Sequence, residues 1–370
     1  MYTFKEIKNN VWNCSVTSNL SLFIVMENSD KSFPANGGLR FFDYKDDQEA
    51  LNDAYMLSRL MHQKHSIYNT GFCGAKVVAN GKINGKNKKL LLEALGVFLN
   101  DLSGKIYTGC DLNTNLIDME FLSQTTPYIL SGLKTNIDTS SATAYGVYGS
   151  LQGIIGENLK KYSFLVHGIG KTGSVVSTLL AKAGARVYTY DSLKTIISGC
   201  NPVKTNEWIK LSVDCLVLCS SSGIINEKIA HDLNCRYIIS GANNPFENSL
   251  VKNILDQKQI QWIPDPISNA GAVISDSVEF YNKNEFYKAE PEALYEFVRN
   301  AVYQKTILFN SLDLKNLSKE KALSTLSKFS SYDQLKCGML FDLNSIGSSF
   351  HNHYVPSSLY GTKKAGSIAN

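Results

Sequence analysis

The chain has 370 residues, of which 44% are hydrophobic, and its formal net charge is +4. This length exceeds what one hydrophobic core usually serves, so the sequence predicts two domains. The small positive excess contains no cluster of Lys and Arg, which argues against a nucleic-acid partner. No apolar stretch approaches the roughly 18 residues of a membrane span, and the first residues form no secretory signal. We therefore expect a cytoplasmic protein with reduced thiols and no membrane partner.

The first part of the chain mixes apolar strands with amphipathic helices. Residues 22–26 predict a short buried strand, and residues 33–38 predict a turn. Residues 46–61 predict a helix, because acidic residues occupy its first turn and apolar residues recur at helical spacing. Further along we expect a turn entering a strand, a second helix and a mostly helical region, at 71–79, 88–102 and 113–160.

From residue 163 short apolar strands alternate with helices. The expected strands are 164–167, 186–190, 215–219, 237–240 and 261–263. Strands at this spacing with helices between them predict a doubly wound parallel sheet. After about residue 276 we expect mostly helix, as far as about residue 345, and a loosely held tail beyond residue 348.

A glycine motif follows the first of these strands. Gly168, Gly170 and Gly173 form a GxGxxG that opens a helix, and Asp191 follows the next strand. In this context the motif predicts a dinucleotide site, with the pyrophosphate at the helix N-terminus. Asp191 would accept hydrogen bonds from the adenosine ribose and repel a 2′-phosphate, which favours NAD, although Lys194 softens that preference. The alternatives are a glycine turn that binds nothing and an Asp191 that only caps the strand end.

Two lysines and one acid are candidates for catalysis. Lys64 falls on the apolar face of the first helix, and Lys76 stands within an apolar strand. Two partly buried ammonium groups would lower each other's pKa, so that one could act as a base near neutral pH. The alternatives are an ordinary surface lysine and a lysine at a helix C-terminus. Asp111 could likewise be only a helix cap.

A series of motifs in fixed order resembles the glutamate/leucine/phenylalanine/valine dehydrogenase family over about residues 30 to 285. Several independent motifs at family spacing make this resemblance specific. The motifs are Gly37-Gly-Leu-Arg40, Lys64, Gly74-Ala-Lys76, Thr108-Gly-Cys-Asp111, Thr143-Ala-Tyr-Gly-Val, the GxGxxG, Gly241-Ala-Asn-Asn244 and Asn269-Ala-Gly271.

The resemblance implies a role for each catalytic candidate. Lys64 matches the lysine that holds the substrate carboxylate, Lys76 the lysine that activates water, and Asp111 the acid that exchanges protons with the substrate nitrogen. A hydride would leave the amino-acid Cα for the nicotinamide, and water would then release ammonia from the imine. Beside the three glycines and Asp191, the expected cofactor contacts are Thr143, Lys171, Thr172, Cys219, Ser220, Asn243 and Asn269.

The position expected to meet the end of a substrate side chain carries no charge. Glutamate-specific relatives carry a lysine at the position of Asn36, beside Gly38, so the resemblance disfavours glutamate. At Gly109 the missing methyl would make room for an aromatic ring, whereas Val273 is typical of branched-chain enzymes. Asn243 is also expected near the substrate. The sequence thus predicts a large neutral amino acid, with aromatic side chains preferred over branched ones.

Several positions depart from the family pattern, and they leave two further hypotheses open. Beside Asn36 and Lys171, the departures are Cys73, Ser222, Ala272 and the histidines that flank the first lysine, His62 and His65. The histidines could tune proton transfer, but helix-end packing is the simpler interpretation. The protein could serve a specialised pathway with an unusual amino or oxo acid. It could also bind NAD and an amino acid without turnover.

The resemblance also implies an architecture. We expect a two-domain α/β protein, with a mixed-sheet substrate and oligomerisation domain at residues 1–135. A Rossmann NAD domain would follow at 136–285, and helices within 286–370 would pack back across both. Family members are homo-oligomers, and the active site would lie in the cleft. Cys215 and Cys219 are the closest pair of thiols and have no partner pair, so we expect no metal site.

Overall fold

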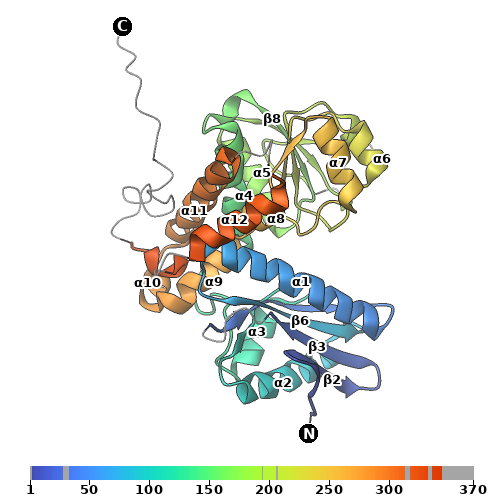
Figure 1. Cartoon of the computed structure of the whole chain (residues 1–370), viewed down its shortest axis with the longest axis vertical. Helices are drawn as coiled ribbons and strands as arrows, with labels where there is room; N and C mark the ends of the chain where they lie inside the picture. The colour runs from blue at the N-terminus through green and yellow to red at the C-terminus, as the bar shows by residue number, and fades with distance from the viewer. Residues whose placement is uncertain are drawn as a thin grey trace.

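Two lobes lie one above the other, with a long helix between them (Figure 1). The computed structural model describes residues 2–27, 33–193, 195–205, 207–312, 317–331 and 336–343. Lys194 and the tail beyond residue 348, for which we had expectations, lie outside these residues. Within the described residues, no helix combines the length and the apolar character that crossing a membrane requires.

The lower lobe is built on a mixed sheet of seven strands in the order β1-β2-β3-β6-β4-β7, with β5 also paired to β6. The strands are β1 (Lys5–Lys8), β2 (Val11–Thr17), β3 (Leu20–Met26), β4 (Ala35–Asn36), β5 (Leu39–Phe42), β6 (Cys73–Gly81) and β7 (Ile106–Tyr107). Strands β4 and β5 run parallel to β6, whereas β3 is antiparallel to it. The sequence did not predict β1 and β2, and the turn expected at 33–38 was wrong in part because it contains β4.

Helices cover both faces of this sheet. They are α1 (Asp47–Tyr68) on one face and α2 (Gly85–Asp101) and α3 (Leu116–Ser123) on the other (Figure 1). Phe23 and Val25 of β3 pack beneath α1, and Leu22 and Ile24 face α2 and α3. This is the alternation that a strand buried on both faces requires.

Helix α1 is longer than the sequence pattern predicts. The Asp46 side chain caps its first turn by accepting from the Glu49 N–H, and Asn69 ends it in a left-handed conformation. The helix therefore continues past residue 61 and carries Lys64 on its surface toward the upper lobe.

The upper lobe is a Rossmann fold, which confirms the predicted doubly wound sheet. Six parallel strands have the order β10-β9-β8-β11-β12-β13, which reverses between β8 and β11. They are β8 (Ser163–His167), β9 (Arg186–Tyr190), β10 (Asn201–Pro202), β11 (Cys215–Leu218), β12 (Tyr237–Ser240) and β13 (Gln261–Trp262). The helices beside it are α4 (Thr139–Ile155), α5 (Lys171–Lys182), α6 (Glu227–Asp232) and α7 (Ser249–Gln257). Residues 124–138 contain no helix, so the mostly helical region expected at 113–160 was wrong there.

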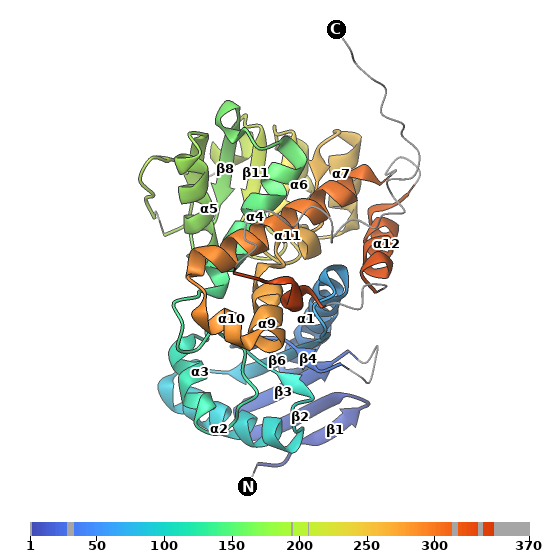
Figure 2. The ribbon, with the colours of Figure 1, turned by 90° about the vertical axis from the view of Figure 1, so that its left-hand side faces the viewer.

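The remaining helices connect the two lobes (Figure 2). They are α8 (Asp265–Ser268), α9 (Gly271–Tyr281), α10 (Lys283–Lys288), α11 (Pro291–Ser311) and α12 (Lys319–Ser331). Helix α11 lies along α4, where a Cβ on Gly149 would come 2.2 Å from the Arg299 carbonyl oxygen. Helix α9 contacts both α4 and α1, and α12 contacts α1. The C-terminal helices thus share the core of the upper lobe and fix α1 of the lower lobe against it.

Candidate active site

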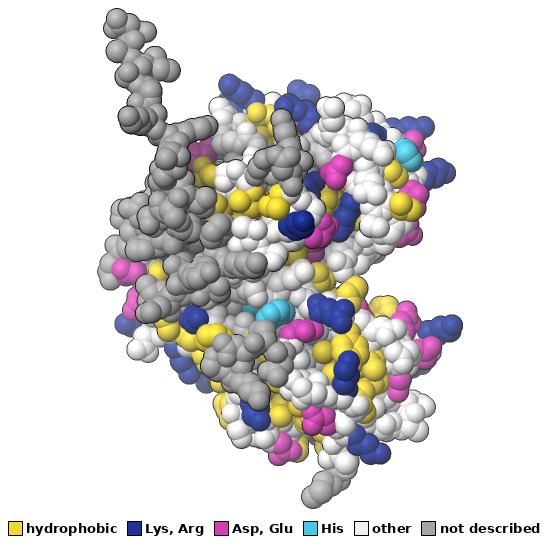
Figure 3. All heavy atoms as spheres, viewed as in Figure 1, with side chains coloured by type: hydrophobic (Ala, Val, Ile, Leu, Met, Phe, Trp, Pro, Cys, Tyr) yellow, Lys and Arg dark blue, Asp and Glu magenta, His cyan; other side chains and the backbone are white. Residues whose placement is uncertain are grey.

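A cleft of about 1500 Å³ lies between the lobes. The space-filling view shows the molecule hollowed at this level, on its right-hand side (Figure 3). Among the predicted site residues, both lobes contribute to the lining: Asn36, Gly38, Lys64, Lys76, Asp111, Thr143, Lys171, Thr172, Ser220, Asn243, Asn269 and Val273. Substrate and cofactor candidates therefore share one cavity.

Close backbone approach brings Lys76 beside Asp111. The chain between β4 and β5 lies so close to β6 that a Cβ on Gly37 would be 1.7 Å from the Ala75 carbonyl oxygen. A Cβ on Gly38 would be 2.9 Å from the Cys110 carbonyl oxygen. Only glycine permits both contacts, and the paired glycines thereby hold the strand of Lys76 against the segment of Asp111.

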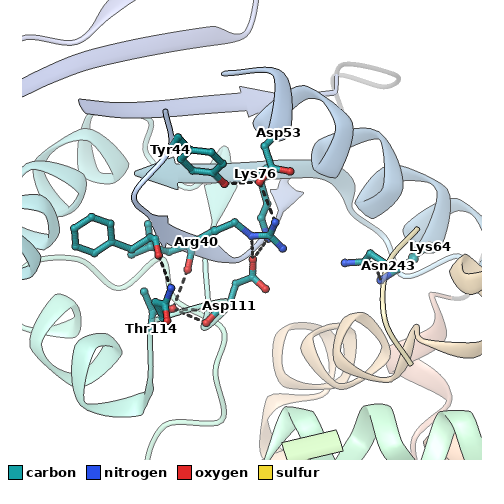
Figure 4. Close-up of polar contacts among 11 residues, drawn as sticks. Arg40, Tyr44, Asp53, Lys64, Lys76, Asp111, Thr114 and Asn243 are labelled. Atoms are coloured by element: carbon teal, nitrogen blue, oxygen red, sulfur yellow. Dashed lines mark hydrogen bonds and ion pairs between the residues drawn. The ribbon is translucent and has the colours of Figure 1, made fainter. Parts of the chain in front are cut away.

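The two catalytic candidates form the centre of an ion-pair network (Figure 4). Lys76 Nζ lies 2.6 Å from Asp111 Oδ2, and Arg40 Nε lies 3.0 Å from the same oxygen. Arg40 also reaches Asp53 Oδ2 at 2.9 Å, and the Tyr44 hydroxyl donates to that oxygen. The sequence analysis assigned no role to Arg40, Tyr44 or Asp53. The one sequence feature that could have identified Arg40 is its place at the end of the Gly-Gly-Leu-Arg motif.

Charge and burial set the protonation of this network. Burial alone would raise the pKa of Asp111, but the positive charges and hydrogen bonds of Lys76 and Arg40 outweigh it and lower that pKa well below its usual range. Burial lowers the pKa of Lys76, and the Asp111 charge opposes this shift. Asp111 is therefore held as a carboxylate, beside an amine that gives up its proton more readily than an exposed lysine.

Lys64 reaches across the cleft from α1. Its Nζ donates to Asn243 Oδ1 at 2.8 Å, and the Asn269 amide donates to the same oxygen at 3.0 Å. Burial, with a smaller contribution from the Lys76 charge, lowers the pKa of Lys64 to about 8, and the nearby Asp265 opposes the shift. Burial is thus the larger cause, and the mutual repulsion of the two lysines that we expected is the smaller one. Asn269 Oδ1 is buried without a hydrogen-bond partner in the described part of the chain, as an acceptor awaiting a ligand would be.

The glycine turn after β8 has the geometry of a dinucleotide site. Gly168 adopts a φ of +93°, and a Cβ on Gly173 would lie 1.9 Å from the Gly168 carbonyl oxygen. A Cβ on Gly170 would meet nothing within 4 Å, so this side of the turn is open. Helix α5 begins there without a side-chain cap, and its free N–H groups and the Lys171 charge favour an anion. The residues present fit a pyrophosphate.

Asp191 stands at the end of β9 beside that turn. Its Oδ2 accepts from the Ile169 N–H at 2.6 Å and its Oδ1 from the Leu193 N–H at 2.7 Å. The carboxylate thus orders the backbone of the turn, and each oxygen keeps a lone pair for a ribose hydroxyl. Like Asp191 and the three glycines of the turn, Cys219 is absent from the cleft lining. It lies beneath the turn, where a Cβ on Gly241 would be 3.1 Å from its Sγ, and burial raises the pKa of its thiol to about 12.

The structure changes the interpretation of Gly109. This residue is absent from the cleft lining, and a Cβ on it would come 2.3 Å from the Leu130 carbonyl oxygen. The close backbone contact explains the glycine, so our argument that a missing methyl makes room for an aromatic ring was wrong.

Two of the departures are packing features. His65 is buried, with Nδ1 2.7 Å from Thr70 Oγ1 and Nε2 3.3 Å from the Asn36 carbonyl oxygen, and burial lowers its pKa to about 3. His62 Nδ1 accepts from the Gly74 N–H at 3.3 Å. Both contacts fit the packing interpretation of the histidines. Within the described residues, no three His, Cys, Asp or Glu side chains gather as metal ligands would.

Comparisons with known proteins agree on one family. A model described as Glutamate/Leucine/Phenylalanine/Valine dehydrogenase matches residues 189–307, and one described as the Glu/Leu/Phe/Val dehydrogenase dimerisation domain matches residues 18–128. The phenylalanine dehydrogenase of Lysinibacillus sphaericus is 31% identical over 272 residues, which cover 68% of this chain and 71% of the relative. The leucine dehydrogenase of Geobacillus stearothermophilus is 29% identical over 266 residues, 68% of this chain and 72% of the relative. The crystal structure of L-tryptophan dehydrogenase from Nostoc punctiforme superimposes with a TM-score of 0.66 at 25% identity, covering 89% of this chain and 95% of that one.

Proposed function

The chain belongs to the glutamate/leucine/phenylalanine/valine dehydrogenase family of amino-acid dehydrogenases, and we propose that it oxidises a large neutral L-amino acid with NAD. The products are the 2-oxo acid and ammonia, and the reaction is reversible. The observation that carries this proposal is the meeting of Lys64, Lys76 and Asp111 in one cleft that opens toward the glycine turn.

Each of these side chains has a task that its setting supports. The Lys64 ammonium, held by Asn243, binds the substrate carboxylate. The Asp111 carboxylate takes a proton from the substrate ammonium and frees the nitrogen lone pair. Lys76, as the free amine that burial favours, then orients water and removes its proton as the water attacks Cα of the imine, and Asp111 returns a proton to the departing nitrogen. The contact between Lys76 Nζ and Asp111 Oδ2 lets the two groups share that proton.

NAD, when bound, accepts the hydride from Cα. The turn around Gly170 and the N-terminus of α5 would hold its pyrophosphate, and Asn269 and Thr143 lie where the cleft joins the two lobes. The carboxylate of Asp191 supports NAD over NADP, because a 2′-phosphate beside it would meet a like charge. We further propose a homo-oligomer that assembles through the lower lobe, since the family model that matches residues 18–128 is described as a dimerisation domain.

The test is the variant Lys76→Ala. Purified protein is supplied with NAD and a panel of L-amino acids, or with NADH, ammonium and 2-oxo acids, and NADH absorbance is followed. We expect the parent to turn over large neutral substrates and Lys76→Ala to lose activity by about 10³-fold or more, because proton transfer and water activation disappear together. NAD affinity, measured by calorimetry, should stay unchanged.

A matched control removes a different lysine of the same lobe. Lys82 is exposed and lies outside the cleft, so Lys82→Ala should keep full activity. Comparable activity of Lys76→Ala and the parent would refute the assigned role. A parent that binds NAD but turns over no amino acid would replace the proposal with the non-catalytic alternative, and turnover confined to an unusual oxo acid would favour a specialised pathway.

A further inference from the structure

One wall of the cleft carries polar groups that the proposed reaction does not use. Asn36 and Ser131 line this wall together with Asp276 of α9. Asn36 lies two residues before Gly38, whose Cβ position is 3.0 Å from Asp111 Cβ. At strand spacing the wall is therefore about 7 Å from the reacting centre, within reach of a long substrate side chain.

Asp276 is a buried acid with few groups around it that could stabilise a negative charge. The residue is 9% exposed, and its carboxyl group hydrogen-bonds to the Asn36 side chain. No Lys, Arg or His in the described ranges lies within 4.0 Å of its carboxylate as an ion-pair partner. Burial, followed by the charge of Glu279, raises the pKa of Asp276 well above its usual range, and the Asn36 bond only partly opposes this.

Glu279, one turn further along α9, shows the contrast. Its Oε2 accepts from the Gly132 N–H at 2.9 Å, so the backbone already satisfies this acid. Asp276 projects into the cleft instead, on the same face of α9 as the apolar Val273.

Ser131 is a second, independent sign of a missing ligand. The residue is 3% exposed, and its Oγ has no hydrogen-bond partner of acceptable geometry among the described residues. The Cys110 thiol beside it is at best a weak partner. Buried polar groups are normally paired, and an unpaired hydroxyl in the same cleft as an acid that has no ion-pair partner among the described residues points to a polar group that enters with the substrate.

We propose that the substrate's side chain ends in an N–H or O–H donor that Asp276 and Ser131 receive, so that these residues and Asn36 determine specificity. This inference rests on the proposed function and deepens it. A hydrocarbon side chain would leave the carboxyl and hydroxyl groups buried against it without partners, which is unfavourable. A donor satisfies them, while Val273 contacts the apolar body of the side chain. The donor can be neutral, as in a phenol, or an ammonium group.

The experiment compares substrates that match in shape and differ in the donor. The pairs are L-tyrosine with L-phenylalanine and L-lysine with L-norleucine, and kcat/KM for NAD reduction is measured for each. We expect the donor-bearing member of at least one pair to be preferred by ~100-fold or more, because a site built to pair a donor discriminates strongly against its absence. Asp276→Leu should reduce that preference to within about threefold, since only shape then separates the pair.

Graded variants keep the test decisive if Asp276→Leu does not fold. Asp276→Asn is nearly isosteric; it should preserve a preference for a phenol and abolish one for an ammonium group. Asn36→Leu should weaken either preference. The control Glu120→Leu makes a comparable change on the exposed surface of α3 and should leave the ratios unaltered.

The outcomes separate the two proposals. Preference of the parent for phenylalanine and norleucine, or ratios that Asp276→Leu leaves unchanged, would overturn the specificity inference while the dehydrogenase assignment stands. Absence of turnover with every amino acid would overturn the proposed function. Calorimetric titration of the same pairs into the NAD-bound protein would then decide the inference, which requires the donor to bind at least ~10-fold more tightly.

Discussion

The two lysines of the cleft are held in different ways. Lys76 lies in a network made entirely by the lower lobe, where Asp111, Arg40 and Asp53 fix one another through contacts of 2.6 to 3.0 Å. Lys64 belongs to the same lobe but donates to Asn243 of the upper lobe. The proton-transfer pair is thus assembled within one lobe, whereas the carboxylate-binding lysine depends on how the two lobes meet.

Because of this difference, we expect substitutions at the two lysines to change different kinetic quantities. A group that is preorganised within one lobe contributes mainly to the chemical step, because its geometry is ready before substrate arrives. A group whose partner lies on the other lobe contributes to binding, and its contacts change if the lobes move as they close on substrate. Variants of the lower-lobe network should therefore change kcat, and variants of Lys64 should change affinity.

The largest expected effect comes from Asp111→Asn. The amide keeps the shape but cannot accept the substrate's proton as a carboxylate does, and it leaves Lys76 and Arg40 buried without their counter-charge. We expect kcat to fall by about 10³-fold while substrate affinity changes little. Initial rates at saturating substrate measure kcat, and binding of a 2-oxo acid measures affinity. A loss that appears only in KM would mean that Asp111 binds substrate and takes no part in the chemical step.

Arg40 provides the graded variant for the same network. Arg40→Met removes one of the two cations that lower the pKa of Asp111, so that pKa should rise. The acid limb of the kcat/KM profile should move up by about one pH unit, with a smaller loss of kcat than in Asp111→Asn. Arg40→Lys should restore part of the shift. An unmoved acid limb would mean that Arg40 acts on folding alone.

A smaller effect is expected at Lys64. Because its pKa is about 8, its ammonium is present below that pH and is lost above it. Binding of an unreactive carboxylate such as 3-phenylpropanoate should weaken by roughly 10-fold between pH 7 and 9.5, as the attraction between charges disappears. Lys64→Arg keeps its charge throughout this range and should flatten the profile, even if its affinity at pH 7 is lower. Calorimetry at each pH makes the measurement, and a parent profile already flat would remove Lys64 from carboxylate binding.

Local sequence signals predicted the Rossmann lobe well. Apolar runs bounded by turns located β9 and β12 at their observed residues, and the spacing of Gly168, Gly170 and Gly173 predicted a turn that the backbone then required. Strand β1 was missed because all four of its residues are exposed and its sequence, Lys-Glu-Ile-Lys, has no apolar pattern. Strand β4 has only two residues, and it exists because β6 and β7 flank it.

The residues of the candidate site also differ in whether a local sequence motif marks them. Lys64, Lys76 and Asp111 carry local motifs, so the resemblance identified them. Asp276 gave no local signal, since an acid on a helix is ordinary, and only the packing of α9 on the lower lobe brings it to Asn36. Gly109 was interpreted wrongly for the same reason, because its close contact with Leu130 joins segments that the sequence pattern does not relate.

A test of stability, not of activity, asks whether folding fixes the lower-lobe side of the site. His65 contacts Thr70 and the Asn36 carbonyl, and its pKa is about 3, against about 6.5 in an unfolded chain. Between these values the unfolded chain binds one more proton, so His65 stabilises the fold fully above pH 6.5 and less as the pH falls toward 3. Between these pKa values, the free energy of unfolding falls by about 1.4 kcal/mol for each pH unit of acidification because of His65. His65→Gln should remove this share of the pH dependence of the free energy of unfolding, measured with urea between pH 6.5 and 4.5. Some pH dependence will remain in this variant, because burial also lowers the pKa of His167, to about 4. The control is His231→Gln, on the exposed surface of α6, which should leave the pH dependence unchanged. A slope that His65→Gln leaves intact would mean that this end of α1 opens before the lobe unfolds. The contrast between a network assembled within the lower lobe and a Lys64 whose partner lies on the upper lobe would then fail.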